Sequence, residues 1–309
     1  MSIPIALVGV GKIACDQHMP TIAASAHFHL AGAVSSHASD LSVPVRGDLT
    51  SLKSAVPDLA AIAVCTPPVD RLRLLKEAFS LGLHVLMEKP PAKTLAEAEM
   101  FAPAARNAGR TLLQSWHSRC AAAVEPMRRW LVGQTVRHVT INWLEDVRVW
   151  HPGQEWIWSP GVGVFDPGIN ALSILTEILP SDLSVRESLL SIPANRSAPI
   201  AASLMIEASA GHDVSVQFSF DQRGPQSWTI DIETATERAT LLDGGSHWAI
   251  GGVEQPLEDD RPEYARLYDQ FADLIANGES DVDLRPFRLV ADAFFLGETK
   301  QAPNFLWDS

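Results

Sequence analysis

Short apolar runs of strand length recur through the first third of the chain, separated by longer segments with helical character. The runs that predict buried strands are Ile3–Val8, Leu30–Val34, Asp58–Cys65, His84–Met87 and Thr111–Ser115. A helix is predicted over 69–81, and a second over 95–108, where Thr94 and Glu97 form a capping box and Gly109 ends the helix. This alternation predicts one doubly wound α/β domain with a parallel sheet over residues 1–118.

The pattern changes after residue 118. A helix is predicted over 121–131, and from Thr135 onward apolar residues recur with the period of a strand. Further strands are predicted over 183–192, 200–206, 214–220, 228–233 and 239–242, and helices over 169–179, 262–277 and 284–297. The second part, 119–309, is therefore expected to be an α+β domain with a large, mostly antiparallel sheet.

A glycine motif stands between the first strand and the segment that follows it. The run Gly9-Val10-Gly11-Lys12-Ile13-Ala14 is a G-x-G-x-x-(G/A) sequence with a strand before it and a helix after it. Gly9 permits the tight turn, and Gly11 lets a pyrophosphate approach the backbone. The motif predicts a Rossmann-type domain that binds a dinucleotide, with Lys12 and Ile13 beside the phosphates.

The end of the second strand bears on the choice between NAD and NADP. In NAD enzymes an acid commonly ends this strand and holds the ribose 2′-hydroxyl. Here the chain reads Ser35-Ser36-His37, with no acid to repel a 2′-phosphate and no arginine to bind one. The pattern favours NADP slightly and leaves NAD, or use of both, open. His37 is also typical of a solvated loop.

Lys89 is held at the end of the fourth predicted strand. Glu88 and Lys89 follow His84–Met87, and Pro90 and Pro91 prevent further ladder bonds. Ligands bind at the carboxyl edge of such sheets, so Glu88 and Lys89 are candidate site residues, as are Thr66 and Pro67 after the neighbouring strand. Taken alone, a lysine before proline is more often a solvated charge.

Two stretches of the second half are too polar and aromatic for a plain sheet, 145–154 and 161–170. In the second, Asp166 and Asn170 lie one helical turn apart and on the same side, which suits the hydroxyl groups of a sugar. Trp150 and Trp228 could stack on a sugar ring. The alternatives are that Asp166 caps a helix beginning at Pro167 and that the tryptophans pack in the core.

Composition and charge limit which kinds of partner the protein is expected to bind. Of 309 residues, 46% are hydrophobic and 20% charged, and the net charge of −13 argues against nucleic acid. Cys15, Cys65 and Cys120 show no metal spacing, and no metal is expected. No apolar stretch approaches the ~20 residues of a membrane helix, and the N-terminus does not read as a signal peptide. The expectation is a cytoplasmic protein.

The motifs together resemble the glucose–fructose oxidoreductase/inositol dehydrogenase (Gfo/Idh/MocA) family. The resemblance rests on the glycine turn, on Glu88-Lys89-Pro90 and on the Gly-x-Gly-x-x-Asp-x-Gly segment ending at Gly168, and it covers nearly the whole chain. The segments 116–119, 145–154 and 164–173 resemble the subgroup of bacterial D-galactose and L-arabinose 1-dehydrogenases. The resemblance implies oxidation of an aldose at C1 to a lactone, with NAD(P)+ accepting the hydride.

The resemblance also implies roles for individual residues. Lys89 is the active-site lysine and Asp166 the site acid. Asn170 stands where many family members have a histidine, so the base must be Asp166 or Lys89. The substrate contacts implied are His117, Glu145, Trp150, His151 and Trp228. The subgroup's NADP-preferring arabinose enzyme carries Ser-Arg where this chain has Ser35-Ser36, which weakens the case for NADP.

Other functions remain open at this point. An inositol-type polyol dehydrogenase, an oxidoreductase that retains its nicotinamide, and a catalytically silent sugar- or cofactor-sensing regulator all fit the same fold. Asn170 speaks against the first, and the presence of Lys89 and Asp166 against the last. The second sheet is expected to form a homodimer or homotetramer contact through apolar residues at alternate positions of its outer face.

Overall fold

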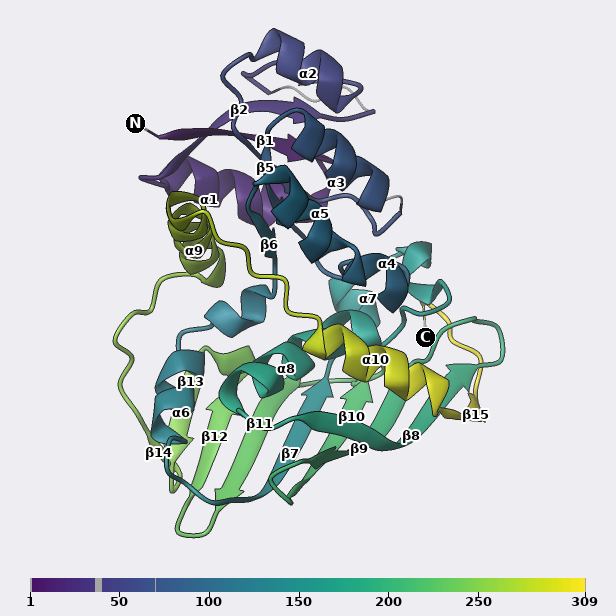
Figure 1. Cartoon of the computed structure of the whole chain (residues 1–309). Coiled ribbons are helices and arrows are strands. Elements are labelled where there is room, and N and C mark those ends of the chain that lie inside the picture. Colours follow the sequence, from purple (N-terminus) through teal and green to yellow (C-terminus); the bar gives the residue numbers. More distant parts are fainter. Residues whose placement is uncertain (1, 37–40, 70, 309) are drawn as a thin grey trace. The chain divides into compact units, whose positions relative to one another are not determined.

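The computed structural model describes residues 2–36, 41–69 and 71–308 (Figure 1). The chain forms two compact units, Met1–His117 with Arg261–Leu284, and Ser118–Asp260 with Arg285–Ser309. The division predicted from the sequence lies after residue 118, and the first segment of the first unit ends at His117. The predicted division differs in one segment, because residues 261–284 group with the first unit although they come late in the chain.

The sheet of the first unit has six parallel strands in the order β3-β2-β1-β4-β5-β6. Their bounds are β1 Ile3–Val8, β2 Phe28–Val34, β3 Val45–Arg46, β4 Ala61–Val64, β5 His84–Met87 and β6 Leu112–Gln114. The strand order reverses between β1 and β4, so a crevice for a ligand is expected at their carboxyl ends. The predicted doubly wound parallel sheet is confirmed.

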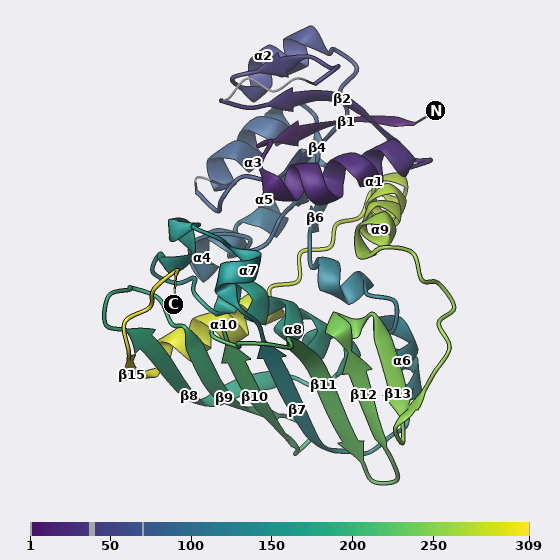
Figure 2. The ribbon, with the colours of Figure 1, turned by 180° about the vertical axis from the view of Figure 1, so that it is seen from behind.

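Helices lie on both faces of this sheet. The helical segments are η1 Ala14–His18, α1 Met19–Ala24, α2 Leu49–Ala55, α3 Arg71–Ser80, α4 Leu95–Glu99, α5 Phe101–Ala108 and α9 Glu263–Asn277. The pair α3 and α5 covers one face and the pair α1 and α9 the other (Figures 1 and 2). After α9 the chain runs beside β6, where Gln114 N donates to Asp281 O at 2.8 Å.

The helix predicted over 95–108 is two helices that meet at Met100. Pro103 accounts for the break, because it lacks the N–H that would bond to Glu99 and its ring would clash with that carbonyl. Thr94 caps α4 as predicted, accepting from Glu97 N at 3.2 Å. The Glu97 carboxylate instead accepts from Leu72 N at 3.2 Å, which ties α4 to the start of α3.

The second unit is built on a nine-stranded sheet in the order β14-β13-β12-β11-β7-β10-β9-β8-β15 (Figure 2). All neighbours pair antiparallel except β7 with β10 and β8 with β15, so the predicted mostly antiparallel sheet is confirmed. The strands are β7 Val136–Leu144, β8 Leu183–Pro193, β9 Ala201–Ala208, β10 Asp213–Ser219, β11 Ser227–Thr234, β12 Arg238–Leu242, β13 His247–Ile250, β14 Val253–Glu254 and β15 Glu298–Ala302.

One face of this sheet carries the core of the second unit. The helical segments are η2 His117–Cys120, α6 Val124–Trp130, α7 Val147–Trp150, η3 Glu155–Trp158, α8 Phe165–Ile178, η4 Asp243–Gly245 and α10 Arg285–Phe295. Figure 1 shows α8 and α10 crossing the same face, where Val139, Ile141 and Trp143 of β7 are buried.

The expected apolar outer face is wrong. The apolar alternate positions of the strands face the helices, because that is where they are removed from water. The opposite face carries mostly short or polar side chains, Thr140, Asn142, Ser203, Ser215 and Gln217 among them.

Candidate active site

The glycine turn lies at the switch point of the first sheet. Gly9 has φ +90°, and its N–H donates to Val34 O of β2 at 2.9 Å. A Cβ at Gly9 would lie 2.8 Å from Thr66 Cγ2, so only glycine fits between the ends of β1 and β4. A Cβ at Gly11 would meet nothing within 4 Å, so its backbone is open to a ligand. Of the predicted neighbours, Lys12 is exposed and pairs with Asp16.

An arginine that sequence analysis missed lies beside the end of β2. Arg46 ends β3 in register with Val34, and its carbonyl accepts from Ser35 N at 3.0 Å. Ser36 and Arg46 are exposed, while His37 lies outside the described residues. The sequence around Ser35 holds no arginine, and only the pairing of β2 with β3 brings one to this position.

The end of β5 is fixed by a buried carboxylate and a buried arginine. Glu88 Oε2 accepts from Lys89 N at 3.1 Å, and Glu88 Oε1 accepts from Tyr264 Oη at 2.8 Å. Arg71 of α3, 1% exposed, donates to the carbonyls of Thr66 and Glu88, each at 2.5 Å, and so links the ends of β4 and β5. The Glu88 side chain is buried among these partners, and its role in cofactor binding stays a prediction.

The electrostatics of this cluster favour the charged form of Glu88. Burial by itself raises its pKa, but the hydrogen bond and charge of His18, the charge of His117 and the bond from Tyr264 lower it to about 2. Glu88 is therefore ionised at neutral pH.

His117, predicted as a substrate contact, is half-buried beside this cluster. Its Nδ1 lies 2.6 Å from Glu263 Oε2, and its ring stacks on Tyr264 with centroids 5.3 Å apart. Burial lowers the pKa of His117, but the bond and charge of Glu263 and the charge of Glu88 outweigh burial and raise it. The ion pair with Glu263 is a role that the sequence did not suggest.

The site acid of the second unit begins a helix without capping it. Val164 is the N-cap of α8, and Asp166 lies inside the first turn of the helix, so the alternative that Asp166 is the N-cap is wrong. Gly163 has φ +61°, and a Cβ there would lie 2.4 Å from Pro199 O, so glycine is required just before the helix. The Asp166 side chain is 7% exposed, and its Oδ2 lies 3.5 Å from His151 Nε2.

The other predicted substrate residues gather where β7 ends and β11 begins. Glu145 is buried, and its Oε2 accepts from Trp228 Nε1 at 3.0 Å. Trp150 packs edge-on against Trp228, with centroids 5.5 Å apart at 69°, and remains 46% exposed. Asn170 lies one turn along α8 from Asp166, and its carbonyl accepts from Ser173 Oγ at 2.7 Å.

The predicted residues thus fall into two groups. The first unit holds Gly9, Gly11, Lys12, Ile13, Ser35, Ser36, Thr66, Pro67, Glu88, Lys89 and His117, and the second holds Glu145, Trp150, His151, Asp166, Asn170 and Trp228.

Over the described part of the chain, no three His, Cys, Asp or Glu side chains gather as a metal site would require. Within the same part, no helix is both long and apolar enough to cross a membrane.

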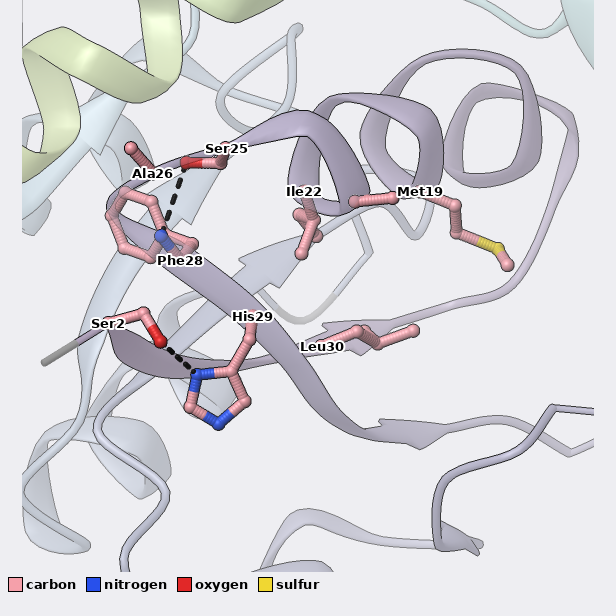
Figure 3. Close-up of a pocket in the computed structure, with 9 residues that line it drawn as sticks. Ser2, Met19, Ile22, Ser25, Ala26, Phe28, His29 and Leu30 are labelled. Atoms are coloured by element: carbon pink, nitrogen blue, oxygen red, sulfur yellow. Dashed lines mark hydrogen bonds between the residues drawn. The ribbon is translucent and has the colours of Figure 1, made fainter.

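A hollow on the first unit lies away from the glycine turn (Figure 3). Ser2, Met19, Ile22, Phe28 and His29 line it, and Ser2 Oγ lies 2.8 Å from His29 Nδ1. It opens at the amino ends of β1 and β2, whereas open α/β sheets bind ligands at the carboxyl ends.

Comparison with known proteins identifies the family. Residues 3–115 match the Gfo/Idh/MocA model, described as an oxidoreductase family with an NAD-binding Rossmann fold. The chain is 43% identical to galactose 1-dehydrogenase of Pseudomonas fluorescens over 306 residues, which is 98% of each chain. This chain belongs to the Gfo/Idh/MocA family of oxidoreductases.

Solved structures share the fold of the whole chain. D-galactose-1-dehydrogenase from Rhizobium etli superposes with a TM-score of 0.93 at 43% identity, covering 99% of this chain and 98% of that one. A 3-ketoreductase from Actinomadura kijaniata, solved with NADP, superposes with a TM-score of 0.85 at 16% identity, covering 98% and 100%. At that identity the second match shows the fold alone. The positive φ and tight packing of Gly9, together with the open approach to Gly11, fit the nicotinamide dinucleotide that the family binds.

Proposed function

We propose that this protein is an NAD(P)-dependent aldose 1-dehydrogenase that oxidises D-galactose, and also L-arabinose, at C1 to the lactone. The observation that carries the proposal is the group in the second unit. It combines the paired Asp166 and His151 with Glu145 and two tryptophan faces. Carboxylates and imidazoles read hydroxyl groups, and tryptophans cover the apolar face of a sugar ring. The 43% identity to galactose 1-dehydrogenase over almost the full chain supports the same assignment.

In the proposed reaction one C–H bond and one O–H bond of the sugar break. The glycine turn at Gly9 and Gly11 would hold NAD(P)+, which would supply the acceptor for the hydride from C1. Asp166 accepts the proton of the C1 hydroxyl, and His151 orients the Asp166 carboxylate. Lys89 donates a hydrogen bond to the same oxygen and stabilises the negative charge that develops there. Glu145 and Asn170 bind other ring hydroxyls, so that an epimer leaves a buried polar group unpaired.

The test is an initial-rate panel on the purified protein that follows the absorbance of the reduced nicotinamide. NAD+ and NADP+ are each crossed with D-galactose, L-arabinose, D-glucose, D-xylose and myo-inositol. Galactose and L-arabinose share their configuration at C2, C3 and C4, so rates confined to these two sugars are expected. Oxidation of myo-inositol alone would replace the proposal by a polyol dehydrogenase. No rate on any sugar, with NADPH still bound, would replace it by a sensing protein.

We also propose that the chain forms a homodimer or homotetramer through the sheet of the second unit. The support is the face of the sheet opposite α8 and α10, which carries short, partly buried side chains such as Thr140 and Ser215. We propose a cytoplasmic location as well, since Cys15, Cys65 and Cys120 form no disulfide.

A further inference from the structure

A cluster of buried polar side chains lies behind Lys89, and the reaction proposed above does not use it. It is formed by His18, Glu88, Tyr264 and Tyr268, all within the first unit. His18 is 0% and Glu88 4% exposed. The two tyrosines are also buried, so the cluster is closed to water.

Each side chain of the cluster is bonded to the next. Tyr268 Oη lies 2.9 Å from His18 Nδ1, and His18 Nε2 lies 3.1 Å from Glu88 Oε1. Tyr264 donates to the same oxygen of Glu88 at 2.8 Å, and Ser115 Oγ lies 3.4 Å from it. Because an ionised carboxylate only accepts, Nε2 of His18 is the donor to Glu88 in any protonation state of the ring.

Two unusual features of the chain bring these residues together. The segment Ala14–His18 directly after the glycine turn is a π-helix, a form that occurs mostly as single turns at functional sites. His18 is its last residue. Tyr264 and Tyr268 lie one turn apart on α9, the helix that comes late in the chain and groups with the first unit. Both rings pack edge-on against His18, with centroids 5.1 Å and 5.8 Å away.

The cluster keeps a negative charge in the interior of the first unit. A buried carboxylate is costly unless donors surround it, and replacing buried charges by apolar groups often leaves stability unchanged. Its second oxygen accepts from the backbone N–H of Lys89 at 3.1 Å. Arg71 holds the carbonyl of Glu88 from the other side. The peptide unit that leads into Lys89 is thus bonded at both its N–H and its C=O.

We propose that Glu88, oriented by His18 and Tyr264, is a positioning residue for Lys89. Its carboxylate fixes the backbone of the lysine and places a permanent negative charge directly behind it. This inference rests on the proposed role of Lys89 in aldose oxidation. The charge of Glu88 helps to raise the pKa of His117, so a titration of His117 detects a change in that charge.

The test compares Glu88→Gln and Tyr264→Phe with Tyr268→Phe as the matched control. Tyr268 lies on the same helix and is equally buried, but it bonds to His18 and not to Glu88. For Glu88→Gln we expect kcat to fall about 10- to 100-fold, since a misplaced reacting group can cost about 100-fold. KM for the sugar and the Kd of NADPH, measured by tryptophan fluorescence, should change less than about threefold. The reason is that the variant leaves intact the interactions that bind ground state and transition state equally. Tyr264→Phe should lower kcat in the same direction by less, and Tyr268→Phe, which reaches Glu88 only through His18, should lower it least.

Two further measurements do not depend on turnover. NMR titration of His117 should show a lower pKa in Glu88→Gln and an unchanged one in Tyr268→Phe. Crystal structures should show the Lys89 peptide displaced in Glu88→Gln only. If kcat falls in all three variants in proportion to their melting temperatures, the cluster only stabilises the core and does not position Lys89. The same conclusion follows if Lys89 is not displaced in Glu88→Gln and kcat is normal. If the wild type oxidises no sugar, the proposed function fails, and the position of Lys89 and the titration of His117 still decide the role of Glu88.

Discussion

At the scale of single residues, the site acid has a partner that is distant in sequence. One helical turn after the acid, where the family resemblance implies a histidine in many members, this chain has Asn170. His151, from the end of α7, comes within 3.5 Å of Asp166 instead. Its other ring nitrogen lies 3.4 Å from Gln154, so the ring is held from both sides. The imidazole therefore faces the acid from a different element.

This arrangement predicts a rescue. His151→Asn should lower kcat, and the double variant His151→Asn/Asn170→His should recover part of it, because position 170 faces the same side of α8 as Asp166. Asp166→Asn should lower kcat by about 10²–10⁴-fold in either background, as expected for loss of a general base. Initial rates and NADPH binding are measured for each variant. No recovery in the double variant would mean that His151 contacts sugar rather than orienting Asp166.

A second prediction at this scale concerns Lys89. Lys89→Ala should keep its melting temperature and NADPH affinity while kcat falls by at least about 100-fold, because a transition-state donor is lost. The control is Lys93→Ala, an exposed lysine on the same connection. Near-normal turnover of Lys89→Ala would show that the lysine is only a charge at a strand end.

At the scale of elements, the sequence located strands and helices well where their pattern is local. β1 and β5 have the predicted bounds, and the Thr94 cap is present. The strands β3, β13, β14 and β15 were missed. β3 and β14 have only two residues each, β13 has four without regular alternation, and β15 is almost wholly polar. The same limit hid Arg46, whose place beside Ser35 depends on strand pairing rather than on any local motif.

The pairing of β2 with β3 leads to a prediction about the cofactor. Arg46→Ala should weaken binding of 2′,5′-ADP about tenfold and leave 5′-AMP unaffected, because a charge-assisted bond to the 2′-phosphate is lost. The ratio of kcat/KM for NADP+ to that for NAD+ should fall in parallel. Calorimetric titration measures the binding, with the exposed Arg73→Ala of α3 as control. Equal effects on both nucleotides would contradict a bond between Arg46 and the 2′-phosphate.

The buried charge after β5 makes stability depend on pH. The pKa of Glu88 is about 2 in the folded protein against an ordinary 4.5, so folding favours its ionised form. This contribution is fully present above pH 4.5 and is lost as the pH falls towards 2; it amounts to about 3 kcal/mol. Urea unfolding at pH 7, 4.5 and 3 should therefore show a steeper acid loss for the wild type than for Glu88→Gln. Parallel curves would show that Glu88 titrates normally.

At the scale of the whole molecule, the sequence predicted the two kinds of sheet but not which unit owns α9. Nothing in the residues around Tyr264 shows that the helix packs with strands more than 150 positions earlier. The spacing of four residues between Tyr264 and Tyr268 is the only local sign that the two side chains lie on the same face of the helix. The predicted site residues from the glycine turn to Trp228 came from motifs, whereas their buried partners His18, Arg71 and Glu263 depend on contacts that motifs do not contain.

The proposed assembly is tested at the same scale. Asn142 lies on β7, the central strand of the nine, in register with Gln217. In a two-fold interface Asn142→Arg would bury a charge close to its own symmetry mate, so the assembly should dissociate. Light scattering should give a multiple of 33.6 kDa for the wild type and for the edge-strand control Val253→Arg, and 33.6 kDa for Asn142→Arg. A monomeric wild type would refute the proposal.

The late position of α9 also constrains how the protein is made and how it can be re-engineered. A ribosome completes all six parallel strands by residue 114, yet Glu263, Tyr264 and Tyr268 emerge only after most of the second unit has been synthesised. Until then Glu88 lacks its tyrosine donor and His117 its acidic partner. Residues 1–117 alone therefore lack contacts that the complete first unit contains. Exchange of nucleotide-binding halves between relatives would have to carry residues 261–284 along with them.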